Sequence, residues 1–328
     1  MIDKDKKRDF ERHVTSFDLD ASEVENLGAA AKAGEAGAAL RAAAAISHVA
    51  FVNPEACMAI LDALTKGWFG ASSRVPATPP AQAEALARLG EAERPGNAFW
   101  ESFWSFVGNS DGPTSGDEVT ARVASLGKHL PESFTALSEA AAIVHPGSAH
   151  AETRPMPPRL TLETLGRQPQ GSLGSDIYRL IVDNSFNLEV LDREAIGLAH
   201  LPPALRYLNT RILQMHDVWH LMGGYRTTVL QEVGISSFQL AQFGHNYSAM
   251  LIATAAAAAH FNSPEAFALV MQIIAEGWQH GRTTPPFMAI DWESEWHRPI
   301  AEIRTHYGIE PFASIYPADL VEQLREAV

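Results

Sequence analysis

Two histidines one helical turn apart are the residues of this sequence best suited to chemistry. His216 and His220 are separated by three residues, so on a helix both imidazoles lie on one face, where they can bind one cation. Glu232 follows twelve residues after His220, and the intervening Gly223-Gly224 predicts a helix end and a chain reversal. The reversal is needed, because one continuous helix would place Glu232 about 18 Å along the axis from His220.

Two imidazoles and a carboxylate form a ligand set for one divalent metal ion and leave positions open for water or substrate. Asp217 lies beside His216, where it can be a ligand, a base or a group that orients a ligand. The alternative is that the histidine pair caps carbonyl groups in the core. The glycine reversal and Glu232 favour the metal. Zinc is the most expected ion, with iron, manganese and cobalt as alternatives.

Helices must position these side chains, because helical spacing dominates the sequence and alternating strand-like runs are scarce. Asn53-Pro54-Glu55 and Ser263-Pro264-Glu265 each combine a capping residue, a proline at the first helical position and an acid in the first turn. We therefore predict an all-α fold, a multi-helix bundle, without an internal repeat. The expected helices cover residues 54–68, 97–107, 117–127, 131–144, 175–194, 203–222, 227–245, 247–261, 264–280, 289–307 and 317–327.

Two segments rich in proline and glycine interrupt these helices, and the longer one, residues 145–174, predicts a crossing between two halves of the chain. We divide the chain into a charged and alanine-rich lead-in over residues 1–45, an N-terminal helical region over 46–160 and a metal-binding helical region over 161–328. We expect the last two regions to share one core, because the composition changes little between them.

The composition is that of a globular protein and excludes several classes. Hydrophobic residues make up 46% of the chain, which argues against disorder, and the net charge of −14 disfavours binding to nucleic acid. The single cysteine, Cys57, cannot form an intramolecular disulfide, and we interpret it as inert packing. The charged N-terminus does not look like a signal peptide, and no run of 18 apolar residues occurs. We therefore expect a cytoplasmic protein.

The segment HDVWHLMGGYRTTVLQEVG, residues 216–234, resembles the His-Asp-x-x-His-(eleven residues)-Glu motif of the Coq4 family of ubiquinone biosynthesis proteins, with the same spacing. The resemblance is good over residues 175–310 and faint before them, and residues 75–160 look like extra sequence. It implies a mostly helical fold. It also implies a divalent metal held by four ligands, His216, Asp217, His220 and Glu232.

The same resemblance implies an activity and partners. Coq4 proteins are associated with other enzymes of coenzyme Q synthesis and are credited with oxidative decarboxylation of a polyprenylated benzoquinone precursor, in which a hydroxyl replaces the carboxylate at ring carbon 1. In this hypothesis the metal acts as a Lewis acid, and Arg211 or Arg282 pairs with the substrate carboxylate. For each arginine a structural ion pair is the alternative.

Other segments have two interpretations each. The charge-free residues 233–264 supply either an apolar slot for the prenyl tail or tight helix packing. The aromatic residues of 97–107 form either core or a peripheral contact with the inner face of the membrane. We also expect a homo-oligomer. The residues that could line the site, or simply be core or surface groups, are His245, His260, His280, Glu293 and His297.

Two alternative functions remain at this point. One is a metal-dependent hydrolase that uses Asp217 as its base. The other is a non-catalytic lipid-binding or scaffold protein, in which the metal is structural and fully ligated.

Overall fold

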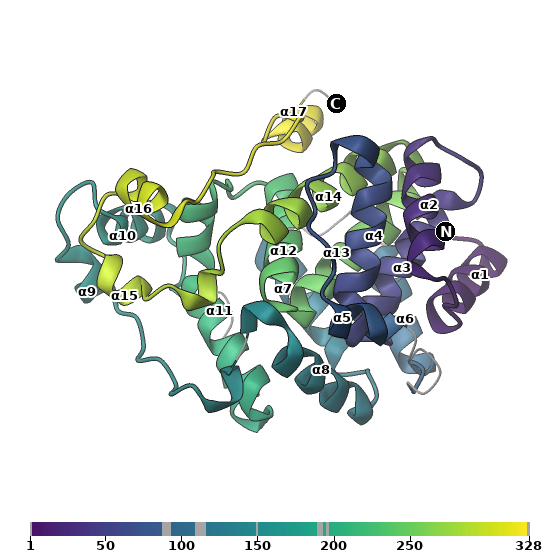
Figure 1. The fold of residues 1–328 in the computed structure, drawn as a ribbon, viewed down its shortest axis with the longest axis horizontal. Helices are drawn as coiled ribbons and strands as arrows, with labels where there is room; N and C mark the ends of the chain where they lie inside the picture. The colour runs from purple at the N-terminus through teal and green to yellow at the C-terminus, as the bar shows by residue number, and fades with distance from the viewer. Residues whose placement is uncertain are drawn as a thin grey trace.

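The computed structural model of the chain describes residues 2–86, 93–108, 116–148, 150–188, 193–194 and 197–326. Within these ranges every regular element is a helix, so the all-α fold is confirmed (Figure 1). The α-helices are α1 (Lys4–Thr15), α2 (Ala21–Lys32), α3 (Ala38–Phe51), α4 (Cys57–Phe69), α5 (Pro80–Ala85), α6 (Asn97–Val107), α7 (Gly116–Gly127), α8 (Glu132–Val144), α9 (Leu162–Gly166), α10 (Leu173–Asn184), α11 (Pro203–Gly223), α12 (Val229–Phe243), α13 (Asn246–Asn262), α14 (Phe267–Thr283), α15 (Trp292–Glu295), α16 (Ile300–Tyr307) and α17 (Leu320–Glu326).

The larger hydrophobic core is built around α3 and α13, which pack against each other. Both helices are rich in buried alanine, and such small side chains allow close contact between helices. Helices α1, α2, α4, α6, α7, α12 and α14 surround this pair. The alanines of residues 233–264 are thus packed against other helices, as the packing interpretation requires.

The N-terminal residues belong to this core. Phe10 and Val14 of α1 are fully buried at i and i+4, and a capping box between Asp20 and Glu23 begins α2. The described part of residues 1–45, the charged and alanine-rich lead-in of the sequence, forms helices packed on the larger core. The core also contains residues from both sides of position 160.

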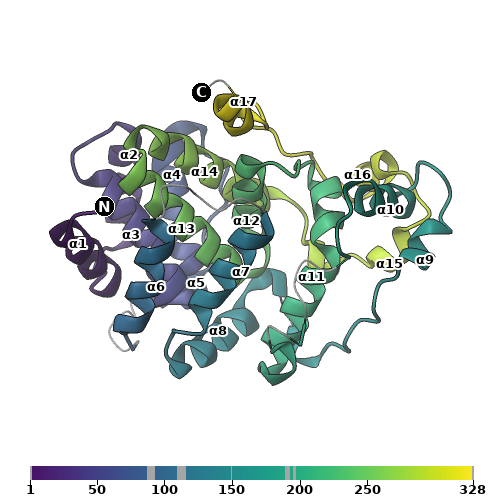
Figure 2. The same ribbon diagram turned by 180° about the vertical axis from the view of Figure 1, so that it is seen from behind.

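A second core lies between α10, α11 and the C-terminal helices α15 and α16. Helix α12 contributes to both cores, with Leu230 and Leu240 in the larger one and Ile235 and Phe238 in the second. Figures 1 and 2 show α12 between the N-terminal helices on one side and α9, α10, α15 and α16 on the other. This central helix carries Glu232.

Most expected helices are present, and two differ. The helix expected over 175–194 ends at Asn184, because Ser185 adopts a left-handed conformation with φ 56°; residues 189–192 lie outside the described ranges. The helix expected over 289–307 is two short helices, α15 and α16, separated at Pro299.

The two Pro-Glu-Ala starts are helical, but they begin as single 3-10 turns, η1 (Pro54–Ala56) and η7 (Pro264–Ala266), that lead into α4 and α14. The side chains of Asn53 and Ser263 make no capping hydrogen bond. Proline at the first position therefore marks these starts without the expected side-chain cap.

The aromatic side chains of α6 are core. Phe99 and Phe103 are fully buried, and Phe103 contacts Phe10 and Phe51. This arrangement agrees with the core interpretation of 97–107 rather than with a membrane contact. Cys57 is also buried, and burial together with the Asp62 charge raises the pKa of its thiol. Over the described residues, none of the helices combines the length and the apolar character needed to cross a membrane.

Candidate metal centre

Helix α11 presents His216 and His220 on one face near its C-terminal end. The two ring centroids are 4.6 Å apart, in an edge-to-face arrangement. The helix ends because Gly224 adopts φ 78°, which is strained for residues with a Cβ, and the backbone N–H of Tyr225 donates to the carbonyl of His220. The chain then turns into α12. The glycine reversal expected from the sequence is therefore present.

Glu232 lies in the first turn of α12 and faces the histidine pair. Its Oε1 is 3.3 Å from Nε2 of His220, and its Oε2 is 3.9 Å from Nε2 of His216. One ligand atom from each of the three residues lies within 4.8 Å of the other two. A tetrahedral zinc site with bonds of about 2.1 Å separates its ligand atoms by about 3.4 Å, so the three side chains are close to this spacing.

The protonation of His220 shows why a cation fits between these side chains. Nδ1 of His220 lies 3.3 Å from the carbonyl oxygen of Tyr225, and a carbonyl only accepts, so Nδ1 carries the proton. In the neutral ring Nε2 is then an acceptor that faces a carboxylate oxygen. This nitrogen is buried and makes no hydrogen bond. A cation between Nε2 and Glu232 would satisfy both groups.

The charges of the site stabilise one another. Burial alone would lower the pKa of His216, but its hydrogen bond to Asp217 and the negative charges of Glu232 and Asp217 outweigh burial and raise it. Burial would raise the pKa of Glu232, but the histidines, His220 foremost, lower it. The carboxylate is therefore ionised, which a metal ligand requires.

Asp217 lies on the other side of the His216 ring. Its Oδ1 is 3.5 Å from Nδ1 of His216, whereas Nε2 of the same ring faces Glu232. Among the described residues, the cluster with metal-ligand spacing contains His216, His220 and Glu232 and does not include Asp217. Of the three roles left open for Asp217, this geometry fits the group that orients a ligand.

Both arginines proposed to bind the substrate carboxylate form ion pairs within the protein. Arg211 makes two hydrogen bonds with Glu293, of 2.5 and 2.7 Å. Arg282 bonds Asp62 through Nε at 2.9 Å, and this carboxylate is almost fully buried. Each guanidinium already has a carboxylate partner within the protein. Both arginines therefore fit the alternative of a structural ion pair better than the binding of a substrate carboxylate.

Tyr225 is a site residue that the sequence analysis missed. Its carbonyl accepts from His220, and its side-chain hydroxyl donates to Nδ1 of His280 at 2.7 Å. His280 in turn donates through Nε2 to the carbonyl of Glu310. His280 therefore acts on the site through Tyr225 and does not reach the ligand atoms. In the sequence, only its position directly after Gly223-Gly224 indicates that Tyr225 lies beside the site.

The remaining histidine candidates are not brought into the cluster. His245 is buried and hydrogen-bonded to Ser248 and Asn209, and the ring of His260 packs against Phe261 and Phe267. Glu293 pairs with Arg211, and His297 lies beyond the end of α15 and is exposed.

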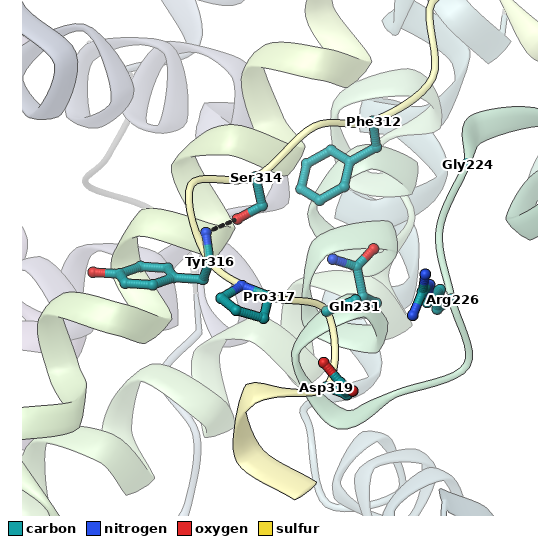
Figure 3. A pocket seen from close by; sticks show the side chains of 9 residues that line it. Gly224, Arg226, Gln231, Phe312, Ser314, Tyr316, Pro317 and Asp319 are labelled. Carbon is teal, nitrogen blue, oxygen red and sulfur yellow. Dashed lines mark hydrogen bonds between the residues drawn. The ribbon is translucent and has the colours of Figure 1, made fainter. Parts of the chain in front are cut away.

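A surface cavity of about 350 Å³ lies beside the turn between α11 and α12 (Figure 3). The C-terminal segment before α17 closes one side of it, and the amide of Gln231 and the guanidinium of Arg226 project into it from the other. The three clustered ligands do not line this cavity. Its lining residues are Gly224, Arg226, Gln231, Phe312, Ser314, Tyr316, Pro317, Ala318 and Asp319.

Comparison with known proteins identifies a similar family and similar individual proteins. A family model described as coenzyme Q (ubiquinone) biosynthesis protein Coq4 matches residues 150–313, half of the chain. The mitochondrial ubiquinone biosynthesis protein COQ4 homolog of Rattus norvegicus is 26% identical over 159 residues, which are 47% of this chain and 58% of the rat protein. The homolog of Drosophila melanogaster is 27% identical over 150 residues, 45% of this chain and 52% of that protein.

The chain thus spans little more than half the length of these curated relatives. A crystal structure of a putative ubiquinone biosynthesis protein from Nostoc punctiforme is similar with 24% sequence identity and a TM-score of 0.48. That similarity covers 65% of this chain and 97% of the other. The matched family region contains all three clustered ligands.

Proposed function

The chain belongs to the Coq4 family of coenzyme Q (ubiquinone) biosynthesis proteins, and on this basis we propose that it is a metal-dependent protein of ubiquinone biosynthesis. Its proposed reaction is the oxidative decarboxylation of a polyprenylated benzoquinone precursor. In this reaction the bond from ring carbon 1 to the carboxylate breaks, CO₂ leaves, and a hydroxyl takes its place. The two-electron oxidation needs an oxidant, for which we propose dioxygen: water supplies the hydroxyl, and dioxygen takes up the two electrons and two protons to become hydrogen peroxide.

The observation that carries the proposal is the meeting of His216, His220 and Glu232, with Nε2 of His220 buried and without a hydrogen bond. A bound divalent ion supplies a Lewis acid that stabilises negative charge developing on the substrate oxygens. Zinc suits the two imidazoles and one carboxylate, and iron, manganese or cobalt would also accept them.

The residues of the chain have separate roles in this proposal. His216, His220 and Glu232 hold the ion, and Asp217 orients the His216 ring by accepting from its Nδ1. Tyr225 fixes the His220 ring through its carbonyl. These two contacts direct both Nε2 atoms at the ion, which would take the place of a proton there.

The exposure of the site favours a reactive metal over a structural one. The side chains of His216 and Glu232 are 24% and 38% exposed, whereas His220 is 1% exposed. Three protein ligands with one accessible side leave room for a substrate oxygen, whereas structural zinc sites are closed by four ligands. The scaffold alternative with a fully ligated metal is therefore less well supported.

The hydrolase alternative lacks its base in this geometry. Asp217 contacts Nδ1 of His216, so the ring lies between its carboxylate and the ligand atoms that face Glu232. A base for a metal-bound water must lie within hydrogen-bond reach of that water. We therefore favour the quinone-precursor reaction.

The test is elemental analysis of the purified protein and of Glu232→Gln, with mass spectrometry of any lipid extracted from the wild type. Glu232→Gln keeps the size of the side chain and removes its charge. We expect one divalent ion per wild-type chain and at least a tenfold loss in the variant. Glu265→Gln, an exposed residue of the 3-10 turn η7, is the matched control and should keep its metal.

Turnover of a prenylated 4-hydroxybenzoate-type substrate should then be measured with and without dioxygen. We expect CO₂ release only in the aerobic, metal-loaded sample. Equal metal contents in the wild type and Glu232→Gln would contradict the metal centre. A metal-loaded protein without turnover, but with a bound prenylated lipid, would instead indicate a carrier or scaffold role among the other enzymes of the pathway.

A further inference from the structure

A sequence pattern occurs twice in this chain, 210 residues apart. Phe-x-x-Pro-Glu-Ala-(ten residues)-Gly-Trp is found over residues 51–68 and again over residues 261–278. The pattern is sparse, and the residues between the shared positions mostly differ. From the sequence we expected no internal repeat, because a pattern this sparse does not stand out there.

The elements of the two segments correspond in the same register. The 3-10 turns η1 and η7 begin at Pro54 and Pro264, and each is followed by a long helix, α4 or α14. Each is preceded by an alanine-rich helix, α3 or α13, and before that by α2 or α12. Both three-helix units therefore have the same order and similar helix lengths, and Figures 1 and 2 show them side by side.

The close helix contacts inside each unit also correspond. Helix α2 packs on α4, and α12 packs on α14. A Cβ added to Gly67 would lie 1.8 Å from the carbonyl oxygen of Glu25, and one added to the equivalent Gly277 would lie 2.3 Å from that of Gly234. In both units the glycine thus permits the same backbone approach, since any larger residue would separate the two helices.

The contacts between the two units are reciprocal. Nε1 of Trp68 donates to Oε1 of Gln272 at 2.6 Å, and Nε1 of Trp278 donates to Oδ1 of Asp62 at 2.8 Å. Trp278 is the equivalent of Trp68, and Gln272 is the equivalent of Asp62. Equivalent helices also meet each other, α3 with α13 and α4 with α14. Such reciprocity is the property of an interface with two-fold symmetry.

We infer that residues 21–69 are a diverged copy of residues 230–279, and that within one chain they fill the place of a second subunit. The matched family region, residues 150–313, contains the second copy but not the first. The buried face of α13 and α14 is thus covered by a segment from outside that region. This inference does not depend on the metal or on the proposed reaction.

Divergence has made the pairing specific to the intact chain. The first copy carries buried Asp62, and Arg282, which lies at the end of α14 just after the second copy, bonds it at 2.9 Å. The second copy has Gln272 where the first has Asp62, and the residue 210 positions before Arg282 is Ser72, in the 3-10 turn η2 (Gly70–Ser72) that follows α4. Two first copies would therefore bury Asp62 without a cation, and two second copies would bury Arg282 without a carboxylate. Only the pairing within the chain satisfies both charges.

The first test is the mass of the full chain, by light scattering after size-exclusion chromatography from about 1 to about 200 µM. We expect a monomer of 35.6 kDa throughout. This would reverse the homo-oligomer expected from the sequence. A stable dimer over this range would overturn the inference, because the built-in copy would not have replaced a second subunit.

The second test exchanges residues between equivalent positions. Asp62→Gln with Arg282→Ser gives each position the residue of its counterpart, so Trp278 keeps a carboxamide acceptor, as Trp68 has in Gln272. The control, Asp62→Ser with Arg282→Gln, introduces the same two residue types at the wrong positions and leaves the Trp278 indole without a partner. We expect the first double variant to melt at least about 3 °C above the control. Equal or reversed melting temperatures would overturn the inference.

Discussion

At the scale of single residues, the candidate site depends on which ring nitrogen of each histidine is free. The Tyr225 carbonyl holds the Nδ1 proton of His220, and Asp217 lies at Nδ1 of His216. Both Nε2 atoms are thereby directed at Glu232. The motif therefore provides a partner for the Nδ1 atom of each ring, and not only the groups that would face an ion at Nε2.

A prediction at this scale separates an orienting role of Asp217 from a ligand role. Asp217→Asn keeps the side-chain shape but weakens the hold on the His216 ring. We expect metal affinity to fall by about 10–100-fold, as for other groups that orient ligands. Competition with a chelator of known affinity measures this change.

The reference variant for this experiment is His216→Ala, which removes a direct ligand and should abolish metal retention. A loss of the same size in Asp217→Asn and His216→Ala would contradict the orienting role. It would make Asp217 a fourth ligand, as the family resemblance implies.

At the scale of elements, the spacing of α12 and α14 decides where Glu232 lies. The two helices meet where Gly277 faces the Gly234 carbonyl, two residues after Glu232. The first copy has the same close contact between α2 and α4 at Gly67, far from any ligand. The two glycines therefore provide matched sites, one of which is coupled to the metal centre.

Substitution of either glycine by alanine tests this coupling. Gly277→Ala and Gly67→Ala both force a Cβ into a carbonyl oxygen, so we expect each to lower the free energy of unfolding by about 1–3 kcal/mol. Only Gly277→Ala should also weaken metal binding, because it displaces α12. Urea unfolding and metal titration measure the two effects.

Gly96→Ala is the control for these variants, since an added Cβ there has open space, and it should leave both quantities nearly unchanged. Metal affinity that falls equally in Gly67→Ala and Gly277→Ala would show that general destabilisation, and not the position of α12, governs the site.

At the scale of the whole molecule, three buried histidines and the partly buried His280 are held neutral. Burial is the largest cause for all of them, and it lowers the pKa of His48 and His280 to about 4 and that of His145 and His245 to about 3. They lie in different parts of the fold, from the α1–α3 contact to the end of α12. Protonation of any one of them would place an uncompensated charge inside the protein.

These histidines predict that acid destabilises the fold. The unfolded chain takes up protons below pH 6.5 while the folded chain does not, so stability falls as the pH decreases from 6.5 towards about 4. Each histidine contributes at most about 1.4 kcal/mol per pH unit. His216, whose pKa is raised, stabilises the fold as the pH decreases, but this single histidine is outweighed by the four whose pKa is lowered. Urea unfolding of the metal-free protein at several pH values measures the slope.

His48→Gln keeps a donor for the Val14 carbonyl, to which Nδ1 of His48 bonds at 2.7 Å, and removes the titrating group. The variant should therefore lose less stability than the wild type between pH 6.5 and 5. Stability that does not change over this interval in the wild type would contradict the account of buried neutral histidines.

The sequence by itself determined the features that follow local rules. Proline at the first helical position marked the starts at Pro54 and Pro264, the i, i+4 spacing placed His216 and His220 on one face, and Gly224 predicted the reversal towards Glu232. Each of these depends on residues within about one turn of one another, whose geometry the backbone fixes.

Only the tertiary structure decided the roles that depend on distant partners. Arg211 is paired with a residue 82 positions away, and Arg282 with one 220 positions away, and no local pattern identifies such partners. The repeat likewise became visible through the reciprocal bonds of Trp68 and Trp278, because few residues outside the contacts are shared. The physical reason is that packing joins side chains across the whole chain, whereas spacing along the sequence constrains only neighbours.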